Sequence, residues 1–202
     1  MYRNRIKRLL DILLSVCGIL CLSWLLLLLA VAIKLDSPGP VFFRQKRVGI
    51  GKRHFQILKF RTMRMDTPHD MPTHLLHDPE QYITRMGRFL RKTSLDELPQ
   101  LWNILVGDMA VIGPRPALWN QYDLLAQRDK YGANDVRPGL TGWAQIHGRD
   151  ELEIAEKAKL DGWYVEHISF LLDVKCFFGT ITAVLRHDGV VEGGTGTLHD
   201  EK

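Results

Sequence analysis

The sequence predicts a mixed α/β fold that is mainly helical, with one small β-hairpin and an N-terminal membrane helix. Three observations predict it. An uncharged apolar run extends over residues 12–33, two short segments rich in Val, Ile and Phe follow it, and helical periodicity dominates the remainder. We therefore expect a membrane-embedded helix in residues 1–36, a folded domain in residues 37–188, and a flexible, glycine-rich tail in residues 189–202.

The apolar run has 22 residues and would be about 33 Å long as a helix, enough to cross the hydrocarbon core. Both flanks are basic, and the positive-inside rule places basic flanks in the cytoplasm. A re-entrant helix that bends and leaves on the same side satisfies this, whereas a straight crossing does not. Ser23, beside Trp24 at mid-run, could support a bend by bonding a carbonyl one turn back. The flanks alone leave both topologies open.

The segment 36–40, with two prolines and a glycine, ends this helix. Residues 41–43 and 55–60 are predicted to pair as a hairpin with a long loop. Lys59 and Arg61 lie two positions apart and therefore share one face of the extended strand. They could hold a phosphate or form a solvated strand edge, and their spacing does not decide between the two.

Residues 80–91 are predicted to form a basic, amphipathic interfacial helix. Its arginines recur at spacings of three, opposite apolar residues: Arg85, Arg88 and Arg91. Such a helix beside a membrane anchor is typical of contact with a lipid surface. Arg88 is also a candidate for binding phosphate.

Two adjacent carboxylates, Asp96 and Glu97, lie where a loop becomes a helix. In the simplest interpretation, Ser94 and Glu97 form a capping box. In the alternative, Asp96 is the N-cap and Pro99 falls in the first turn, where proline is tolerated. The helix dipole would then keep Asp96 ionised. An ionised aspartate can attack phosphorus while the neighbouring glutamate holds a divalent cation.

The C-terminal half is predicted to contain a short strand at 109–112 and helices at 98–105, 117–130, 151–164 and 170–185, with a turn-rich loop at 136–142. Arg115 lies between two prolines, in a backbone with little entropy left to lose, which suits bidentate binding of a phosphate. Arg137 and Arg149 are further candidates for phosphate binding.

Charge is unevenly distributed along the chain. Residues 1–92 carry 17 Lys and Arg against 6 Asp and Glu, a net charge of +11, whereas residues 93–202 carry 10 against 17, a net charge of −7. The basic half suits anionic lipids or phosphorylated substrates. Nucleic acid is not an expected partner, because no motif that binds it is present. The cysteines lack metal or disulfide spacing and are expected to be small buried residues: Cys17, Cys21 and Cys176.

Several motifs in a fixed order resemble the bacterial sugar transferase family, in particular its minimal monotopic polyprenyl-phosphate phosphoglycosyl transferases. The resemblance extends from the N-terminus to about residue 189. The matching segments are residues 40–45, Lys59-Phe60-Arg61-Thr62-Met63, Ser94-Leu95-Asp96-Glu97-Leu98-Pro99-Gln100, residues 107–109, Ile112-Gly113-Pro114-Arg115-Pro116, and residues 136–142.

The resemblance implies a reaction in two steps. The aspartate matching Asp96 attacks the sugar-linked phosphate of a UDP-sugar and expels UMP, and undecaprenyl phosphate then attacks the aspartyl phosphosugar, which starts a lipid-linked glycan. The glutamate matching Glu97 helps to hold Mg²⁺. The resemblance also implies a re-entrant helix in contact with membrane lipids and a catalytic domain, residues 37–188, on the cytosolic face of the bacterial inner membrane.

The chain departs from the family at two points. Ser23-Trp24 stands where such proteins often have Ser-Pro, so a bend must depend on Ser23 or on packing. His147 stands where the family has Asn in a motif that ends at Arg149. The role that the resemblance implies is therefore assigned to Arg149 but not to His147. The competing function is a non-catalytic, membrane-anchored basic adaptor in which Asp96 and Glu97 merely cap a helix. A homo-oligomer is compatible with the sequence, which determines neither the sugar nor the glycan pathway.

Overall fold

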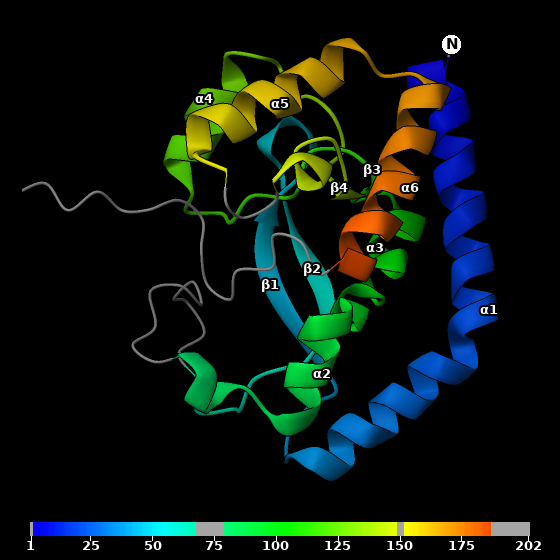
Figure 1. Cartoon of the computed structure of the whole chain (residues 1–202), viewed down its shortest axis with the longest axis vertical. Coiled ribbons are helices and arrows are strands. Elements are labelled where there is room, and N and C mark those ends of the chain that lie inside the picture. Colours follow the sequence, from blue (N-terminus) through cyan, green and yellow to red (C-terminus); the bar gives the residue numbers. More distant parts are fainter. Residues whose placement is uncertain (1, 68–78, 149–151, 187–202) are drawn as a thin grey trace, which may run out of the picture.

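The computed structural model describes residues 2–67, 79–148 and 152–186. Within these ranges the fold is mainly helical, with two small two-stranded sheets (Figure 1). The helices and strands are α1 (Lys7–Asp36), β1 (Phe42–Val48), β2 (His54–Phe60), α2 (Arg85–Thr93), α3 (Gln100–Val106), β3 (Ala110–Ile112), α4 (Tyr122–Asp129), β4 (Gly139–Thr141), α5 (Ile154–Glu166) and α6 (Phe170–Arg186). The predicted mainly helical fold with a small hairpin is confirmed, whereas the predicted tail lies outside the described residues.

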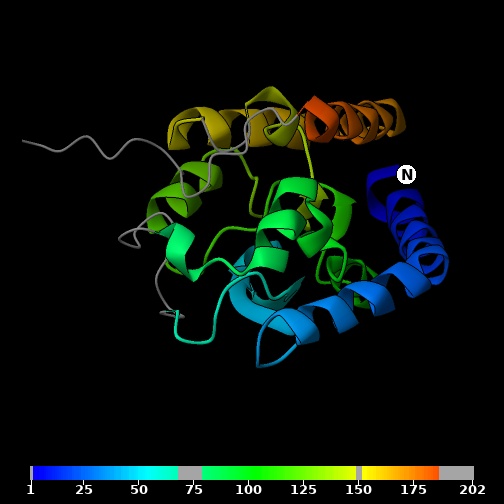
Figure 2. The ribbon, with the colours of Figure 1, turned by 60° about the horizontal axis from the view of Figure 1, so that its bottom comes forward.

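Helix α1 is continuous over 30 residues and is long and apolar enough to cross a membrane, by length and composition. It ends at Asp36, as predicted. Both ribbon views show that it changes direction part-way along (Figures 1 and 2). The hydroxyl of Ser23 donates to the carbonyl of Leu20 at 2.9 Å, which confirms the predicted bond to the preceding turn. Bonds of this kind are associated with bent helices.

The two parts of α1 attach to the rest of the chain in different ways. Near its start, Arg8 donates to the last carbonyls of α3, and the Asp11 carboxylate accepts from the backbone N–H of Val111 in β3. Near its end, Leu29 and Ile33 are each 2% exposed and pack against the hairpin and α2. Polar bonds therefore hold the first part, whereas the second is held by apolar packing together with one polar bond, in which the Asp36 carboxylate accepts from the N–H of Met86 in α2.

Strands β1 and β2 pair antiparallel, which confirms the hairpin. The first strand continues to Val48, beyond the predicted segment, through a basic stretch. Along it, Arg44 and Lys46 are exposed, while Gln45 and Arg47 are partly buried. Because successive side chains of a strand point to opposite faces, charged residues fit on the solvent side of such a hairpin.

The second sheet was not predicted. Strand β4 pairs parallel with β3, although the sequence predicts a turn-rich loop in this region. The dipeptide Pro138-Gly139 suits a type II turn by sequence, but Gly139 does not have the positive φ that such a turn requires. Its role is close approach, because a Cβ there would lie 2.1 Å from the backbone nitrogen of Gly113.

Helix boundaries differ from the predictions where side-chain capping intervenes. The predicted basic helix begins only at Arg85, because Thr84 accepts a hydrogen bond from the N–H of Gly87 and caps it, and a separate 3-10 helix, Pro79–Tyr82, precedes it. Of the cysteines, Cys176 is buried as expected. Cys17 and Cys21 are exposed instead, because most of α1 faces away from the folded domain.

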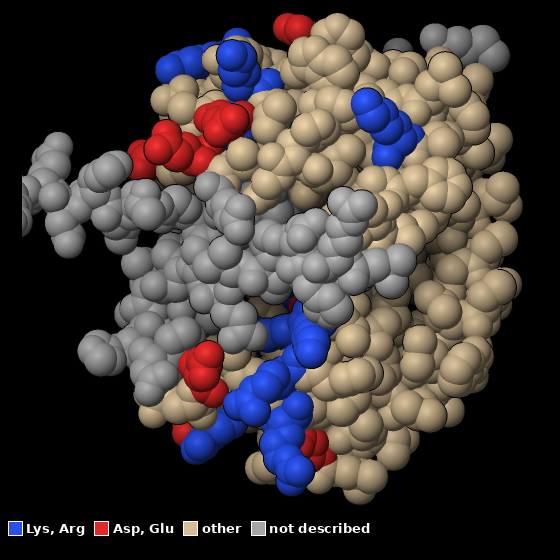
Figure 3. All heavy atoms as spheres, viewed as in Figure 1, with Lys and Arg blue, Asp and Glu red and all other residues tan. Residues whose placement is uncertain are grey.

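The surface is divided between charged and apolar regions. In Figure 3 the side of the molecule along which α1 and α6 run in Figure 1 carries almost no charged side chain. Exposed apolar residues of these two helices include Leu20 (69%), Trp24 (66%) and Leu171 (78%). Basic side chains instead gather in a band over the region of α2 (Figure 3), where Arg85, Arg88 and Lys92 are exposed.

Candidate active site

The two adjacent carboxylates lie in a single 3-10 turn, Leu95–Glu97, between α2 and α3. Ser94 ends α2 in the left-handed conformation (φ 56°), and α3 begins only after Pro99. No side chain caps either the 3-10 turn or α3, so both capping hypotheses for Ser94 and Asp96 are wrong. The left-handed residue reverses the chain before a helix can start, which leaves the carboxylates on a turn rather than in a helix.

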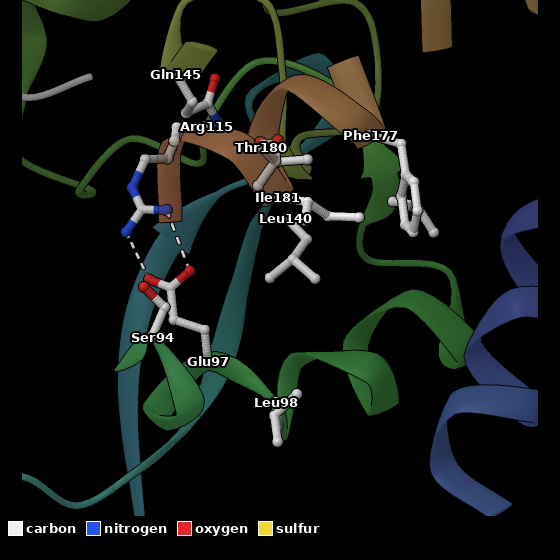
Figure 4. Close-up of a pocket in the computed structure, with 12 residues that line it drawn as sticks. Ser94, Glu97, Leu98, Arg115, Leu140, Gln145, Phe177, Thr180 and Ile181 are labelled. Carbon is white, nitrogen blue, oxygen red and sulfur yellow. Dashed lines mark hydrogen bonds and ion pairs between the residues drawn. The ribbon is translucent and has the colours of Figure 1, made fainter. Parts of the chain in front are cut away.

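Two cations bind these carboxylates. Arg115 Nη2 lies 2.6 Å from Glu97 Oε1 and Nη1 lies 3.3 Å from Oε2 (Figure 4). Lys59 Nζ lies 2.8 Å from Glu97 Oε1 and 3.4 Å from Asp96 Oδ2. The exposed fractions of the four side chains range from 12% for Asp96 to 35% for Arg115. The structure thus brings four of the predicted site residues into one cluster.

The two carboxylates have opposite electrostatic environments. Burial alone would raise the pKa of Glu97, but the charges of Arg115 and Lys59 and their hydrogen bonds hold that pKa well below its ordinary value. Burial raises the pKa of Asp96, with Lys59 opposing the shift and the Glu97 charge adding to it. The expectation that a helix N-terminus keeps Asp96 ionised is therefore not met. Glu97 is a fixed anion, whereas the charge of Asp96 depends on its surroundings.

A further arginine, Arg47, lies behind the cluster on β1. It donates to the carbonyl of Pro116 at 3.1 Å and to Gln45 Oε1 at 2.8 Å. Burial, together with the charge of Arg115, lowers the pKa of Arg47 to about 10, while Glu97 opposes the shift. In the sequence, the only signal for Arg47 is that it is one of several basic residues in the hairpin region.

The backbone at Arg115 is held by a buried ion pair. Arg128 donates to Asp161 Oδ2 from Nε at 2.8 Å and from Nη2 at 2.6 Å, and its Nη1 donates to the carbonyl of Arg115 at 2.9 Å. Their side chains are 4% and 2% exposed. No sequence pattern marks this support, because the partners lie on different helices 33 residues apart.

The other predicted phosphate-binding residues lie outside this cluster. Arg61 donates to the carbonyls of Pro38 and Ser37, so its guanidinium holds the chain where α1 ends. Arg137 is exposed and donates to the carbonyl of Gly107. Arg88 is exposed on α2. Arg149 lies outside the described residues.

A cavity of about 180 Å³ opens beside Glu97 and Arg115 (Figure 4). Gln145, in its lining, is 8% exposed, and neither atom of its carboxamide has a hydrogen-bond partner among the described residues. An unpaired buried polar group costs about 1–3 kcal/mol, so Gln145 is a candidate for binding a ligand. In the sequence, Gln145 is the first residue of the motif Gln145-Ile146-His147-Gly148-Arg149, and that position was the available signal for its role.

Asp96 and Glu97 are the residues that fit a divalent cation. Among the described residues, no three His, Cys, Asp or Glu side chains gather as a ready-made metal site. Mg²⁺ is usually held by one or two carboxylates and completes its shell with water and substrate phosphates. The pair therefore fits a cation that binds together with a phosphorylated substrate.

The family model for bacterial sugar transferases matches residues 2–187. The chain belongs to this family. Its sequence is 40% identical over 185 residues to EpsL, an uncharacterized sugar transferase of Bacillus subtilis, with 92% of this chain and 90% of EpsL aligned. The family membership agrees with the resemblance drawn from the motifs around Lys59, Asp96 and Arg115.

Two further relatives carry named activities. The chain is 43% identical to a UDP-N-acetylgalactosamine-undecaprenyl-phosphate N-acetylgalactosaminephosphotransferase of Aeromonas hydrophila, over 89% of this chain and 44% of that protein. It is 42% identical to a UDP-glucose:undecaprenyl-phosphate glucose-1-phosphate transferase of Escherichia coli, over 88% and 40%. The chain thus spans less than half the length of these two relatives.

Proposed function

We propose that this chain transfers a sugar 1-phosphate from a UDP-sugar to undecaprenyl phosphate, releases UMP and starts the assembly of a lipid-linked glycan. The observation that carries the proposal is the cluster in which Lys59 and Arg115 bind the adjacent carboxylates Asp96 and Glu97. Two named relatives act on a UDP-sugar and undecaprenyl phosphate, which supports the same substrate classes here.

In the first step, an Asp96 oxygen attacks the phosphorus that carries the sugar, and the bond from that phosphorus to UMP breaks. Lys59 and Arg115, now paired with Glu97, take up phosphate oxygens of the two substrates in turn. In the second step, an oxygen of undecaprenyl phosphate attacks the same phosphorus, and the bond to Asp96 breaks. Each step exchanges one P–O bond for another, and Asp96 is regenerated as a carboxylate.

Asp96 must be ionised to attack, yet burial raises its pKa. The proposed role of Glu97 is to help hold Mg²⁺ beside it, with substrate phosphates completing the shell. When bound, Mg²⁺ would supply positive charge that neutralises the phosphates facing an anionic nucleophile. Glu97 suits this role because the pKa of its carboxyl is held low, so it stays anionic.

The adaptor hypothesis has less support than the enzymatic one. It requires Asp96 and Glu97 to serve as helix caps, and neither side chain caps a helix. The test is UMP release from a panel of UDP-sugars with undecaprenyl phosphate and Mg²⁺. Release with at least one sugar, dependent on Asp96, is expected. A chain that is folded and membrane-bound but releases no UMP from any UDP-sugar would favour the adaptor.

We also propose that α1 is re-entrant, with the catalytic domain on the cytosolic face. Its bend, the Ser23 bond and the basic flanks support this topology (Figures 1 and 2). Single cysteines at Asn4 and Thr197, in a background without the native cysteines, should both resist an impermeant thiol reagent in intact cells. Labelling of position 4 alone in intact cells would establish a spanning helix instead.

A further inference from the structure

The cavity beside Glu97 and Arg115 has a polar end and an apolar end. Figure 4 shows Arg115, Glu97 and Gln145 at one end and Phe177 at the other, on the side where α1 lies. The remaining wall is largely aliphatic, with Leu98, Leu140, Ile181 and others in the lining. A ligand that fills it must carry hydrogen-bond acceptors or charge at one end and apolar groups at the other.

The apolar end continues into the outer surface of α6. Phe177 and Ile181 line the cavity and are also each 43% exposed. The neighbouring Phe178 is 61% exposed, and the side of the molecule along which α6 runs carries almost no charge (Figure 3). An exposed apolar surface of this extent is typical of contact with lipid or with a partner. A ligand in the cavity can therefore extend directly into that surface without crossing a charged rim.

These features decide between the two substrates of the proposed function. At about 180 Å³, the cavity is smaller than the roughly 300–1,000 Å³ of pockets that enclose whole drug-sized ligands. A sugar nucleotide would leave hydroxyl groups unpaired against Leu140 and Ile181, which is costly. Isoprene units have no polar atoms to leave unpaired, and a terminal phosphate can bind Arg115 and the unpaired Nε2 of Gln145.

We propose that this cavity binds the acceptor, with the phosphate of a polyprenyl phosphate at Arg115 and Gln145 and its first isoprene units along Leu140, Phe177 and Ile181. The rest of the lipid chain leaves over α6 toward α1. The inference rests on the proposed function, because it assigns one of its two substrates to a subsite. The sugar nucleotide then approaches from the side of the basic band over α2 (Figure 3).

A substitution in the cavity lining and a control outside it test the assignment. Ile181→Ser should raise the KM for undecaprenyl phosphate about tenfold, because an aliphatic contact with the isoprene units is lost, while the KM for the UDP-sugar stays unchanged. Tyr122→Ser is the control, because it removes an exposed aromatic side chain from α4, a helix that contributes no residue to the cavity lining. It should change neither KM. A selective rise in the KM for the UDP-sugar, or an equal effect of Tyr122→Ser, would overturn the proposal.

A second measurement does not require turnover. A photoreactive polyprenyl phosphate, with the reactive group on its first isoprene units, is added to the Asp96→Asn variant in vesicles. Crosslinks should map to the segment of α6 containing Phe177 and Ile181, and crosslinks confined to α1 or α2 would overturn the assignment. If the wild-type chain releases no UMP from any UDP-sugar, the proposed function fails, and the crosslink still decides whether the cavity binds this lipid.

Discussion

Two arginine–carboxylate pairs involve Arg115, one through its backbone carbonyl and the other through its side chain, and they differ in their surroundings. Arg128 and Asp161 are 4% and 2% exposed and bond to each other and to the Arg115 carbonyl. Arg115 and Glu97 are 35% and 13% exposed, border a cavity and share Glu97 with Lys59. Arg128–Asp161, the closed pair, is inaccessible to ligands and holds the backbone. Arg115–Glu97, the open pair, can exchange its partners when a phosphate enters. The same chemistry is thus structural in one place and available for catalysis in the other.

The largest expected effect is a loss of transfer rate when Asp96, the carboxylate next to Glu97 of the open pair, is changed. Asp96→Asn should lower the transfer rate at least about a thousandfold, because an amide is not a nucleophile. The melting temperature should change little, since Asp96 caps no helix. Asp66→Asn, which alters an exposed ion pair with Arg64, is the control and should keep full activity. Full turnover by a well-folded Asp96→Asn variant would remove the covalent step.

Breaking the closed pair should lower the stability of the protein. Asp161→Asn should lower the free energy of unfolding by about 3–5 kcal/mol, because it leaves the Arg128 charge buried without its partner. Urea unfolding measures this. Glu97→Gln is the matched change in the open pair; it should cost less stability than Asp161→Asn, because Arg115 is 35% exposed and Lys59 keeps Asp96 as a partner, and it should lower both the rate and the response to Mg²⁺. Equal losses of stability in the two variants would contradict the distinction between the pairs.

Arg115→Lys tests whether the open pair depends on geometry or only on charge. The substitution should lower kcat/KM by about ten- to a hundredfold, because the planar two-pronged donor is lost while the positive charge is kept. Arg64→Lys, in an exposed ion pair, serves as the control and should be neutral. If lysine replaces Arg115 without loss, the residue acts as a point charge.

The smallest effect expected is a shift in pH dependence. Activity requires ionised Asp96, whose pKa is raised by burial, so kcat/KM should fall as the pH drops through a value above the ordinary 3.9 or so. Lys59 opposes this shift, because its charge favours the carboxylate. Lys59→Gln should therefore move the acidic limb to higher pH, as a pH–rate profile would show. If the acidic limb stays at the same pH in the Lys59→Gln variant, Lys59 does not influence the ionisation of Asp96.

The residues of the open pair were singled out from the sequence, although their pairing was not, whereas neither residue of the closed pair was. Lys59, Asp96, Glu97 and Arg115 each lie in a short local motif whose composition already suggests phosphate chemistry. The Arg128–Asp161 pair has no such motif, because long-range packing of two helices creates it.

The unexpected strand β4 has the same origin. It exists only because the backbone at Gly139 can approach Gly113, which no local preference encodes. The failed capping hypotheses have a local cause: the left-handed conformation of Ser94 overrode a helix-start pattern that was otherwise well formed.

The central claim is that Asp96 forms a covalent bond to the phosphosugar, and intact-protein mass spectrometry tests it most directly. Wild-type protein incubated with its UDP-sugar and Mg²⁺, without undecaprenyl phosphate, should gain the mass of one sugar phosphate, located on the peptide containing Asp96. Addition of the lipid should remove that mass, and Asp96→Asn should never acquire it. Wild-type protein that completes the transfer without an adduct, or an adduct that persists in Asp96→Asn, would contradict the claim.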